Sequence, residues 1–370
     1  MKITKIIAIL IASFMLLTIT TACNGNAEPT DINTATDEQN NIDTEGETPD
    51  NPDSPETNVI KIVSTTFPQY DWIREIIGNN DSLFELTLLA DSVVDLHSYE
   101  PSISDIAKIS ECDMFIYVGG ESDDWVENAL NNANNNEMVV INLVDELGDA
   151  VKMERVTDGM EHDGYDDDDD DDDHDEHDDE HDDDEEDEHV WLSLRNAQLF
   201  CEVISEAISL LDPENSVIYK NNADAYIESL KALDEEYQIM VNAARVDTLL
   251  FADRFPFLYL VDDYGLDFYA AFSGCSAETE ASFSTIATLA GKLDELGLKY
   301  IMVTESSDKT IAEAIIENGS SKDQIILILD AMQSVTTVEL QGGVTYLSIM
   351  ESNLEVLREA LESESEPTLG

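Results

Sequence analysis

Two series of alternating strand and helix patterns, separated by one long helical stretch, constrain this chain more than any other feature of its sequence. Short apolar runs such as VIKIVS (59–64) and QIILIL (324–329) alternate with amphipathic segments. This alternation is typical of parallel sheets covered by helices on both faces. The stretch 213–244 between the series keeps apolar residues at helical spacing, and one helix of that length spans roughly 45 Å. We therefore predict an α/β protein with two lobes of parallel sheet flanked by helices, joined by one long linking helix.

The expected elements follow the same order in both series. In the first series, strands are predicted at 59–64, 83–89, 114–118 and 138–142, and helices at 69–77, 102–109, 123–131 and 194–211. In the second series, strands are predicted at 248–252, 268–271, 300–304 and 324–329, and helices at 255–264, 282–296, 309–318 and 345–361. Ser282 is placed to cap one of these helices. Because ligands of open parallel sheets bind beyond the carboxyl ends of the strands, we expect the site in a cleft between the lobes.

The N-terminal 23 residues have the pattern of a lipoprotein signal peptide. Two lysines precede an apolar stretch, 6–19, which is short for a spanning helix, and small residues lead to Cys23. We expect cleavage before Cys23 and its lipidation; the alternative is an ordinary signal with an incidental cysteine. Residues 24–58 contain ten acidic residues and no basic one, which predicts a disordered acidic tether. The expected domains that follow are an N-terminal lobe (59–212), the linking helix (213–244), a C-terminal lobe (245–364) and a tail (365–370).

The charge of the chain restricts its partners. There are 83 acidic and 17 basic residues, for a net charge of −66. Nucleic acid and anionic lipid headgroups are excluded as partners because both require basic surfaces. We expect contact with a membrane through the lipid anchor only, and a cation as the ligand.

An acidic loop, 158–188, interrupts the first series. Positions 166–188 hold twenty acids and three histidines, His174, His177 and His181. Dense like charge predicts an extended segment that is dispensable to the core. Either the loop binds cations nonspecifically, or its histidines form a weak auxiliary site that raises the local concentration of Zn²⁺.

Only two of the six histidines lie where the predicted fold places a cleft. His97 follows the second strand, and His189 directly precedes a helix. Imidazole is a frequent ligand of first-row metals, and two imidazoles with carboxylates would bind Zn²⁺ or Mn²⁺. The chain has no P-loop, GxGxxG or HExxH motif, and no Ser/His/Asp set stands out.

The remaining cysteines, Cys112, Cys201 and Cys275, lack the spacing of a zinc ribbon or a CxxC motif. Cys201 falls on the apolar face of a predicted helix and is expected in the core. A disulfide between Cys112 and Cys275 is possible in an extracytoplasmic protein.

Seven short segments occur in a characteristic order along the chain. They are TTFPQYDW (65–72), DLHSYEP (95–101), HVWLS (189–193), YGL (264–266), TES (304–306), LDAM (329–332) and YLSIMESNLEVLREAL (346–361). Together they resemble the zinc- and manganese-specific solute-binding lipoproteins of bacterial ABC importers, over roughly residues 59–364. The resemblance implies two α/β lobes joined by a rigid helix, with the metal held between them.

The resemblance also implies a set of ligands. The family's two histidine ligands match His97 and His189, and its C-terminal aspartate ligand matches Asp330. Its third ligand, a His or Glu, falls on Arg254, which cannot ligate a cation. We weigh Asp253, Glu278 or Glu280, or a water molecule, in its place. Glu305 is expected near the site as a hydrogen-bond acceptor for a ligand.

The implied function is capture of a divalent metal outside the cytoplasm and its delivery to an ABC permease and ATPase, without catalysis and by a monomer. We expect Zn²⁺ because of the histidines in the acidic loop and because imidazole suits zinc. Mn²⁺ is the alternative, because two imidazoles with two carboxylates are typical of manganese binders. A secreted metallohydrolase and a surface adhesin are the alternatives from other classes.

Overall fold

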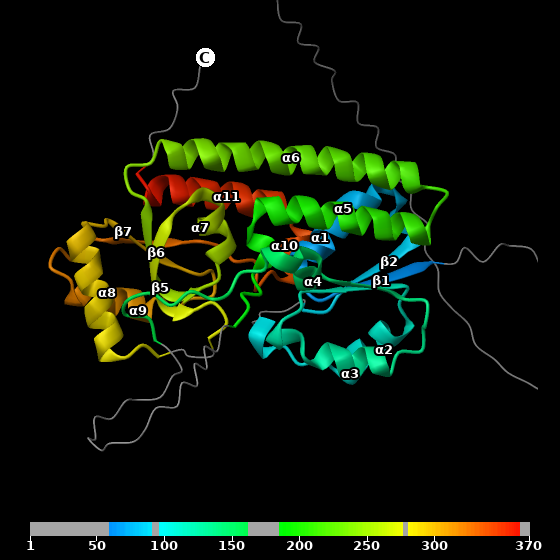
Figure 1. Ribbon diagram of the computed structural model, residues 1–370, viewed down its shortest axis with the longest axis horizontal. Helices are drawn as coiled ribbons and strands as arrows, with labels where there is room; N and C mark the ends of the chain where they lie inside the picture. The colour runs from blue at the N-terminus through cyan, green and yellow to red at the C-terminus, as the bar shows by residue number, and fades with distance from the viewer. Residues whose placement is uncertain (1–58, 91–95, 162–184, 277–279, 363–370) are drawn as a thin grey trace, which may run out of the picture. The chain divides into compact units, whose positions relative to one another are not determined.

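The computed structural model describes residues 59–90, 96–161, 185–276 and 280–362, all within one compact unit, Glu56–Gly370 (Figure 1). Several sequence predictions lie outside the described residues. They are the signal and Cys23, the tether, the tail, Glu278 and the loop histidines His174, His177 and His181.

Two four-stranded parallel sheets form the lobes, and the predicted fold class is confirmed. The N-terminal sheet contains β1 (Ile60–Ser64), β2 (Phe84–Leu88), β3 (Met114–Tyr117) and β4 (Val139–Asn142), in the order β2-β1-β3-β4. The C-terminal sheet contains β5 (Thr248–Phe255), β6 (Asp267–Ser273), β7 (Tyr300–Val303) and β8 (Ile325–Ile328), in the equivalent order β6-β5-β7-β8. In each sheet the second strand lies on one side of the first, and the third strand lies on its other side. The strand order therefore reverses between β1 and β3 and between β5 and β7. Open parallel sheets bind ligands at such a switch point.

Helices cover these sheets and connect them. They are α1 (Phe67–Ile77), α2 (Ile103–Glu111), α3 (Trp125–Asn131), α4 (Leu143–Leu147), α5 (Leu194–Leu211), α6 (Ser216–Asn242), α7 (Leu258–Tyr264), α8 (Phe283–Leu296), α9 (Thr310–Asn318), α10 (Thr337–Gln341) and α11 (Tyr346–Ala360). Ser282 caps α8 as predicted, because its side chain accepts a hydrogen bond from the Thr285 amide at 3.1 Å. The short helices α4 and α10 were absent from the sequence prediction. Each has five residues, too few to show a helical period.

One strand differs clearly from its prediction. The strand was expected to end at residue 252 and a helix to begin at 255, but β5 continues to Phe255 and α7 begins at Leu258. The pairing of β5 with β6 shifts register between Phe251 and Arg254, and regular pairing then resumes. Pro256 follows the strand and favours an extended conformation for the residue before it, which extends the strand rather than the helix.

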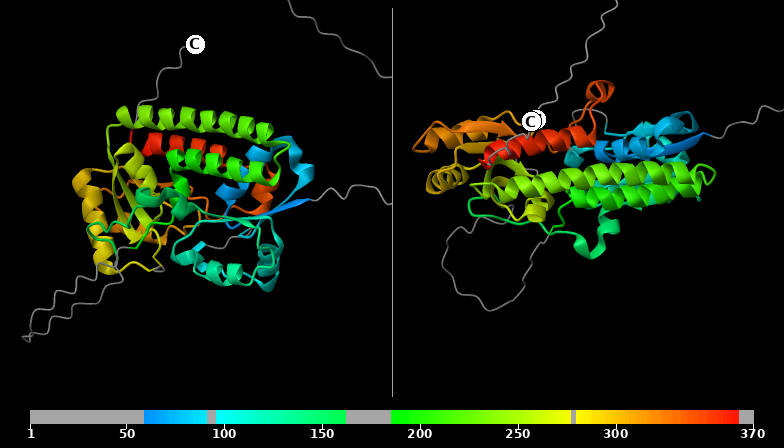
Figure 2. Two further views of the ribbon diagram at one scale, coloured as in Figure 1. Left: turned by 45° about the vertical axis from the view of Figure 1, so that its right-hand side comes forward. Right: turned by 90° about the horizontal axis from the view of Figure 1, so that it is seen from above.

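The long helix α6 has 27 residues and packs against both lobes. It contacts α1 and α5 along its first half and α7 and α11 along its second half, and Figure 2 shows α6 running along both lobes. One apolar cluster includes residues from both sheets, among them Ile62 of β1 and Phe251 of β5. The buried Tyr237 of α6 also donates a hydrogen bond to the Met350 carbonyl of α11 at 2.7 Å. The lobes therefore share a continuous core instead of being joined by a flexible linker.

The three cysteines of the described chain are free thiols. The expectation of a disulfide between Cys112 and Cys275 is therefore wrong. Cys112 is fully buried beside α2 in the N-terminal lobe, where its thiol donates to the Ile109 carbonyl at 3.2 Å. Cys275 follows β6 in the other lobe. Cys201 lies in the core, as expected. No helix in the described ranges combines the length and apolar character needed to cross a membrane.

Candidate metal centre

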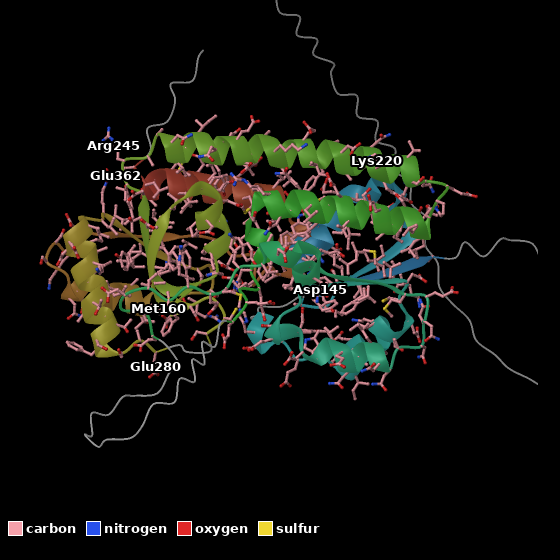
Figure 3. All side chains as sticks on the ribbon, viewed as in Figure 1. Asp145, Met160, Lys220, Arg245, Glu280 and Glu362 are labelled. Atoms are coloured by element: carbon pink, nitrogen blue, oxygen red, sulfur yellow. The ribbon has the colours of Figure 1, made fainter. Side chains whose placement is uncertain are left out.

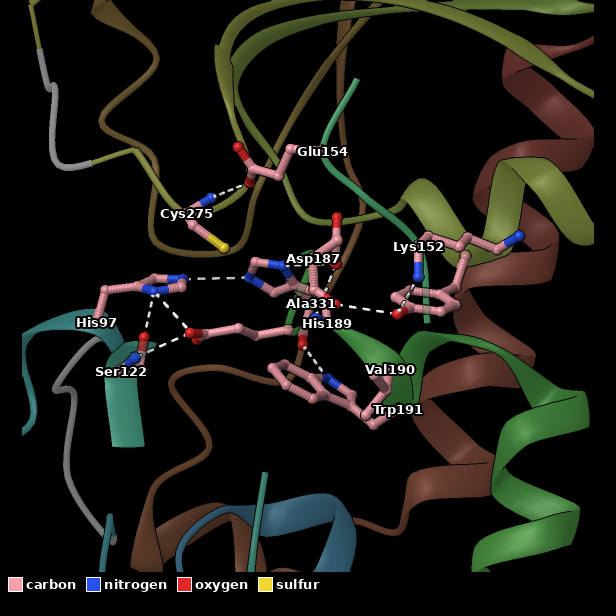
Figure 4. Close-up of polar contacts among 12 residues, drawn as sticks. His97, Ser122, Lys152, Glu154, Asp187, His189, Val190, Trp191, Cys275 and Ala331 are labelled. Carbon is pink, nitrogen blue, oxygen red and sulfur yellow. Dashed lines mark hydrogen bonds and ion pairs between the residues drawn. The ribbon is translucent and has the colours of Figure 1, made fainter. Parts of the chain in front are cut away.

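His97 and His189 are 92 positions apart in the sequence, and the structure brings their rings together. Their Nε2 atoms lie 3.2 Å apart (Figure 4). His97 belongs to a one-turn 3₁₀ helix, Leu96–Ser98, that follows β2, and His189 directly precedes the 3₁₀ helix Val190–Leu192. The His189 side chain is fully buried, and that of His97 is 10% exposed. The pair is thus shielded from bulk water, and only the His97 ring remains partly accessible to solvent.

Carboxylate and hydroxyl groups hold the outer nitrogens of both rings. Asp187 Oδ1 lies 3.2 Å from His189 Nδ1 and also accepts the His189 amide at 2.8 Å. Ser122 Oγ lies 2.7 Å from His97 Nδ1. Since a carboxylate only accepts hydrogen bonds, His189 carries its proton on Nδ1 and presents the Nε2 lone pair to His97. This is how metal-ligating imidazoles are usually oriented.

Glu188 adds a buried negative charge beside the pair. Its Oε1 accepts the Ser122 amide at 2.8 Å, and its Oε2 faces His97 Nδ1 at 3.7 Å. Burial raises the pKa of Glu188, and the hydrogen bonds from Ser122 oppose that rise. Gly120, with φ of +78°, makes the arrangement possible, because a Cβ at this position would collide with the Glu188 carboxylate.

Two residues of the C-terminal lobe complete the immediate surroundings of the rings. His97, His189 and Cys275 each offer one donor atom, and these three atoms all lie within 4.8 Å of one another. In Figure 4 the sulfur of Cys275 points toward the imidazole rings of His97 and His189. Gln333 places its amide Nε2 at 2.8 Å from His189 Nε2. Burial raises the pKa of the Cys275 thiol, and the nearby carboxylates of Glu154, Asp187 and Glu188 raise it further.

The predicted carboxylate ligands Asp330, Asp253 and Glu280 are not among the residues of the described chain whose donor atoms lie within 4.8 Å of one another. Asp330 Oδ1 accepts the Met332 amide at 2.8 Å, and burial together with the charge of Glu305 raises the pKa of Asp330 to about 7. Asp253 Oδ2 accepts the Thr304 hydroxyl at 2.7 Å. Glu280 is exposed on the outside of the C-terminal lobe (Figure 3).

The structure also shows the positions of Glu305 and Arg254, the other two residues considered in the sequence. Glu305 follows β7, and its carboxylate accepts the amides of Ala331 at 2.8 Å and Gln333 at 3.0 Å. It therefore holds the loop that carries Gln333 to His189. Arg254 lies on β5, paired with Phe272 of β6.

The ends of the acidic loop are part of the core, which corrects the expectation that all of 158–188 is dispensable. Met160 is 9% exposed and belongs to the main apolar cluster. Asp187 and Glu188 are buried and support the two rings. Asp187 and Glu188 were not predicted as site residues because they end a run of twenty acids that indicates a solvated segment. Their position immediately before His189 was the available signal.

A two-lobed α/β protein with a histidine pair between its lobes, each ring held at its outer nitrogen, has the construction of a metal-specific solute-binding protein. The comparison with known families agrees: residues 62–360 match ZnuA, described as zinc-uptake complex component A, periplasmic. The chain belongs to this family, and the resemblance found in the sequence is confirmed.

The individual relatives share a modest sequence identity with this chain. The zinc-binding protein AdcA of Streptococcus pyogenes serotype M1 is 28% identical over 300 residues, covering 81% of this chain and 55% of AdcA. The chain thus spans about half the length of that protein. The high-affinity zinc uptake system protein ZnuA of Bacillus subtilis is 28% identical over 302 residues, covering 82% of this chain and 88% of that protein. The crystal structure of the Zn(II)-bound ZnuA-like domain of Streptococcus pneumoniae AdcA has a TM-score of 0.63 at 24% identity, covering 82% of this chain and all of that domain.

Proposed function

We propose that this protein captures Zn²⁺ outside the cytoplasm and delivers it to the permease and ATPase of an ABC importer. Its membership of the zinc-uptake family supports this function, as do the relatives named for zinc binding. The protein acts as a monomeric carrier held at the outer face of the membrane by a lipid on Cys23. It catalyses no reaction, in keeping with a family described as an uptake component.

The observation that carries the proposal is the spacing of the two inner nitrogens. Nitrogens bound to a tetrahedral Zn²⁺ at about 2.0–2.1 Å are separated by about 3.3 Å. His97 Nε2 and His189 Nε2 are 3.2 Å apart. Both rings are oriented by partners at Nδ1, so that their Nε2 atoms face each other.

Zinc is favoured over manganese by the chemistry of the donors. Imidazole nitrogen suits a borderline-soft ion such as Zn²⁺, whereas Mn²⁺ prefers carboxylate and water oxygens. The carboxylates of Asp330 and Asp253 are engaged in other hydrogen bonds. The two imidazole nitrogens that face each other therefore favour zinc over manganese.

Isothermal titration calorimetry of the purified protein with Zn²⁺ tests the proposal. Wild type should bind one ion tightly. His97→Ala and His189→Ala should each weaken this binding by more than the roughly 10- to 100-fold that follows loss of a ligand's hydrogen-bond partner. His177→Ala is the matched control and should leave the affinity unchanged. Tight one-to-one binding that survives His97→Ala would contradict the proposal.

A further inference from the structure

We propose that Cys275 is the third protein ligand of the captured ion and that its thiolate gives the site its preference for zinc. The inference rests on the proposed function and adds a ligand that neither the motif positions nor the expected carboxylates supply. The position expected for that ligand holds Arg254, at the end of β5. Cys275 comes from the neighbouring strand of the same sheet.

The topology explains how a neighbouring strand supplies the donor. β5 and β6 are parallel and paired, with Phe255 opposite Ser273 in register, so the two strands end side by side. Cys275 lies two residues beyond Ser273, at the carboxyl edge of the sheet. Ligands of parallel sheets collect at this edge. A donor that follows β6 therefore reaches the same region as one that follows β5.

The backbone around Cys275 is held in place near the two rings. The Cys275 amide donates to Glu154 Oε1 at 2.7 Å, which fixes the turn after β6 (Figure 4). The preceding Gly274 lies so close to His189 that a Cβ there would be 3.0 Å from the ring carbon Cε1. The approach of this turn to the imidazole is thus close and specific.

The distances suit a zinc–thiolate bond. With a Zn–S bond of about 2.3 Å and Zn–N bonds of about 2.0–2.1 Å, tetrahedral geometry separates sulfur and nitrogen by about 3.6 Å. The donor atoms of Cys275, His97 and His189 already lie within 4.8 Å of one another, so a movement of about 1 Å completes the geometry. As the Zn–S bond forms, the thiol proton passes to solvent, and no oxidant or reductant is required.

Cys275 also differs from the other cysteines of the described chain. Cys112 and Cys201 are fully buried in apolar clusters, whereas Cys275 is partly exposed beside polar groups. Two imidazoles and a thiolate select zinc over manganese, because soft sulfur donors bind zinc well and oxygen donors suit manganese.

Substitution of Co²⁺ for Zn²⁺ provides a direct spectroscopic test. A thiolate bound to Co²⁺ produces an intense charge-transfer absorption in the near ultraviolet that imidazole and carboxylate ligands do not produce. The wild-type protein loaded with one equivalent of Co²⁺ should show this band. It should disappear in Cys275→Ser and persist in Cys201→Ala, which removes a thiol outside the site. Zn²⁺ affinity should fall in Cys275→Ser by more than the roughly 10- to 100-fold typical of a lost supporting hydrogen bond.

A second variant tests the preference between metals. Cys275→Asp replaces sulfur with oxygen, so Zn²⁺ binding should weaken and the ratio of Zn²⁺ to Mn²⁺ affinity should fall at least tenfold relative to wild type, measured by competition titration. An unchanged ratio would overturn the claim that the thiolate sets the preference.

The outcomes separate this inference from the proposed function. If wild type binds Zn²⁺ through His97 but shows no thiolate band, and Cys275→Ser binds Zn²⁺ equally well, the inference fails and the proposed function stands. If wild type binds no Zn²⁺, the proposed function fails and the inference fails with it.

Discussion

Asp71 is the buried acid of α1, and it lies in the apolar core beneath α11. Its Oδ2 accepts the Tyr346 amide at 2.8 Å, and its Oδ1 faces Arg74 Nη1 at 3.6 Å. Burial raises the pKa of Asp71 from 3.8 to about 6, more than these two partners lower it. Because the folded pKa lies above the unfolded one, the protonated form is favoured by folding. The contribution of Asp71 to stability is therefore complete below about pH 4 and is lost as the pH rises through about 6.

The variant Asp71→Asn isolates this titration because an amide does not ionise. The free energy of unfolding of the variant minus that of wild type should rise between pH 4 and pH 8, by up to about 3 kcal/mol for a shift of about two pKa units. Urea unfolding at both pH values measures the difference.

Asp105→Asn is the matched control for this experiment. Hydrogen bonds from Ser102 and the charge of Lys108 lower the pKa of Asp105 below 3.8, so its contribution to stability is lost only at lower pH and the difference between Asp105→Asn and wild type should change little between pH 4 and pH 8. If the free energy of unfolding of Asp71→Asn minus that of wild type stays constant between pH 4 and pH 8, the pKa of Asp71 is not raised in the folded protein.

The turn after β6 brings the backbone of the C-terminal lobe close to His189. A Cβ on Gly274 would lie 2.9 Å from the Phe255 carbonyl oxygen and 3.1 Å from His189 Nδ1. Because one of these neighbours is backbone, Gly274→Ala should displace either the turn or the ring. We expect Zn²⁺ affinity to fall roughly 10- to 100-fold, the range typical of disturbed ligand support.

Gly291→Ala is the control for Gly274→Ala. A Cβ at this position in α8 meets no atom within 4 Å, so alanine should stabilise the helix by about 0.5–1 kcal/mol and leave zinc binding unchanged. Calorimetric titration and thermal unfolding of both variants measure the two effects. Wild-type affinity in Gly274→Ala would mean that the turn does not constrain His189.

The elements and the two histidines were predictable from local patterns: His97 follows a predicted strand, and His189 directly precedes a predicted helix. Apolar runs gave the strands, and His97 was recognised because it follows one. Cys275 follows a strand in the same way, but a single cysteine has no spacing partner that indicates a metal site. Its convergence with the histidines depends on the pairing of β5 with β6, and such long-range pairing is not visible in local patterns.

The acidic residues next to His189 were missed for a different reason. Asp187 and Glu188 continue an acidic run whose charge indicates solvation, and only tertiary contacts show that they turn inward to His189 and Ser122. Charge density in a sequence reports the average environment of a segment. It does not report the environment of the residues at its ends.

At the scale of the whole molecule, the negative charge concentrates cations around the protein. Replacing residues 166–184 with a glycine–serine linker of equal length removes most of the acidic loop and keeps Asp187 and Glu188. The tight Zn²⁺ site and the stability should be unchanged, while additional weak Zn²⁺ binding at low ionic strength should decrease. The difference should vanish at high salt because exposed charges are screened there.

Equilibrium dialysis of both proteins at low and high salt measures this weak binding. Equal Zn²⁺ loading of the two proteins at low salt would contradict an auxiliary role for His174, His177 and His181. Loss of the tight site in the replaced protein would instead show that the loop supports the fold.

The central claim is that His97 and His189, from distant parts of the chain, bind the same zinc ion. X-ray diffraction from crystals of the zinc-loaded protein, collected on both sides of the zinc absorption edge, tests it most directly. The account predicts one strong anomalous peak about 2 Å from the Nε2 atoms of both rings. A zinc peak away from this pair, with the two nitrogens still facing each other, would contradict it.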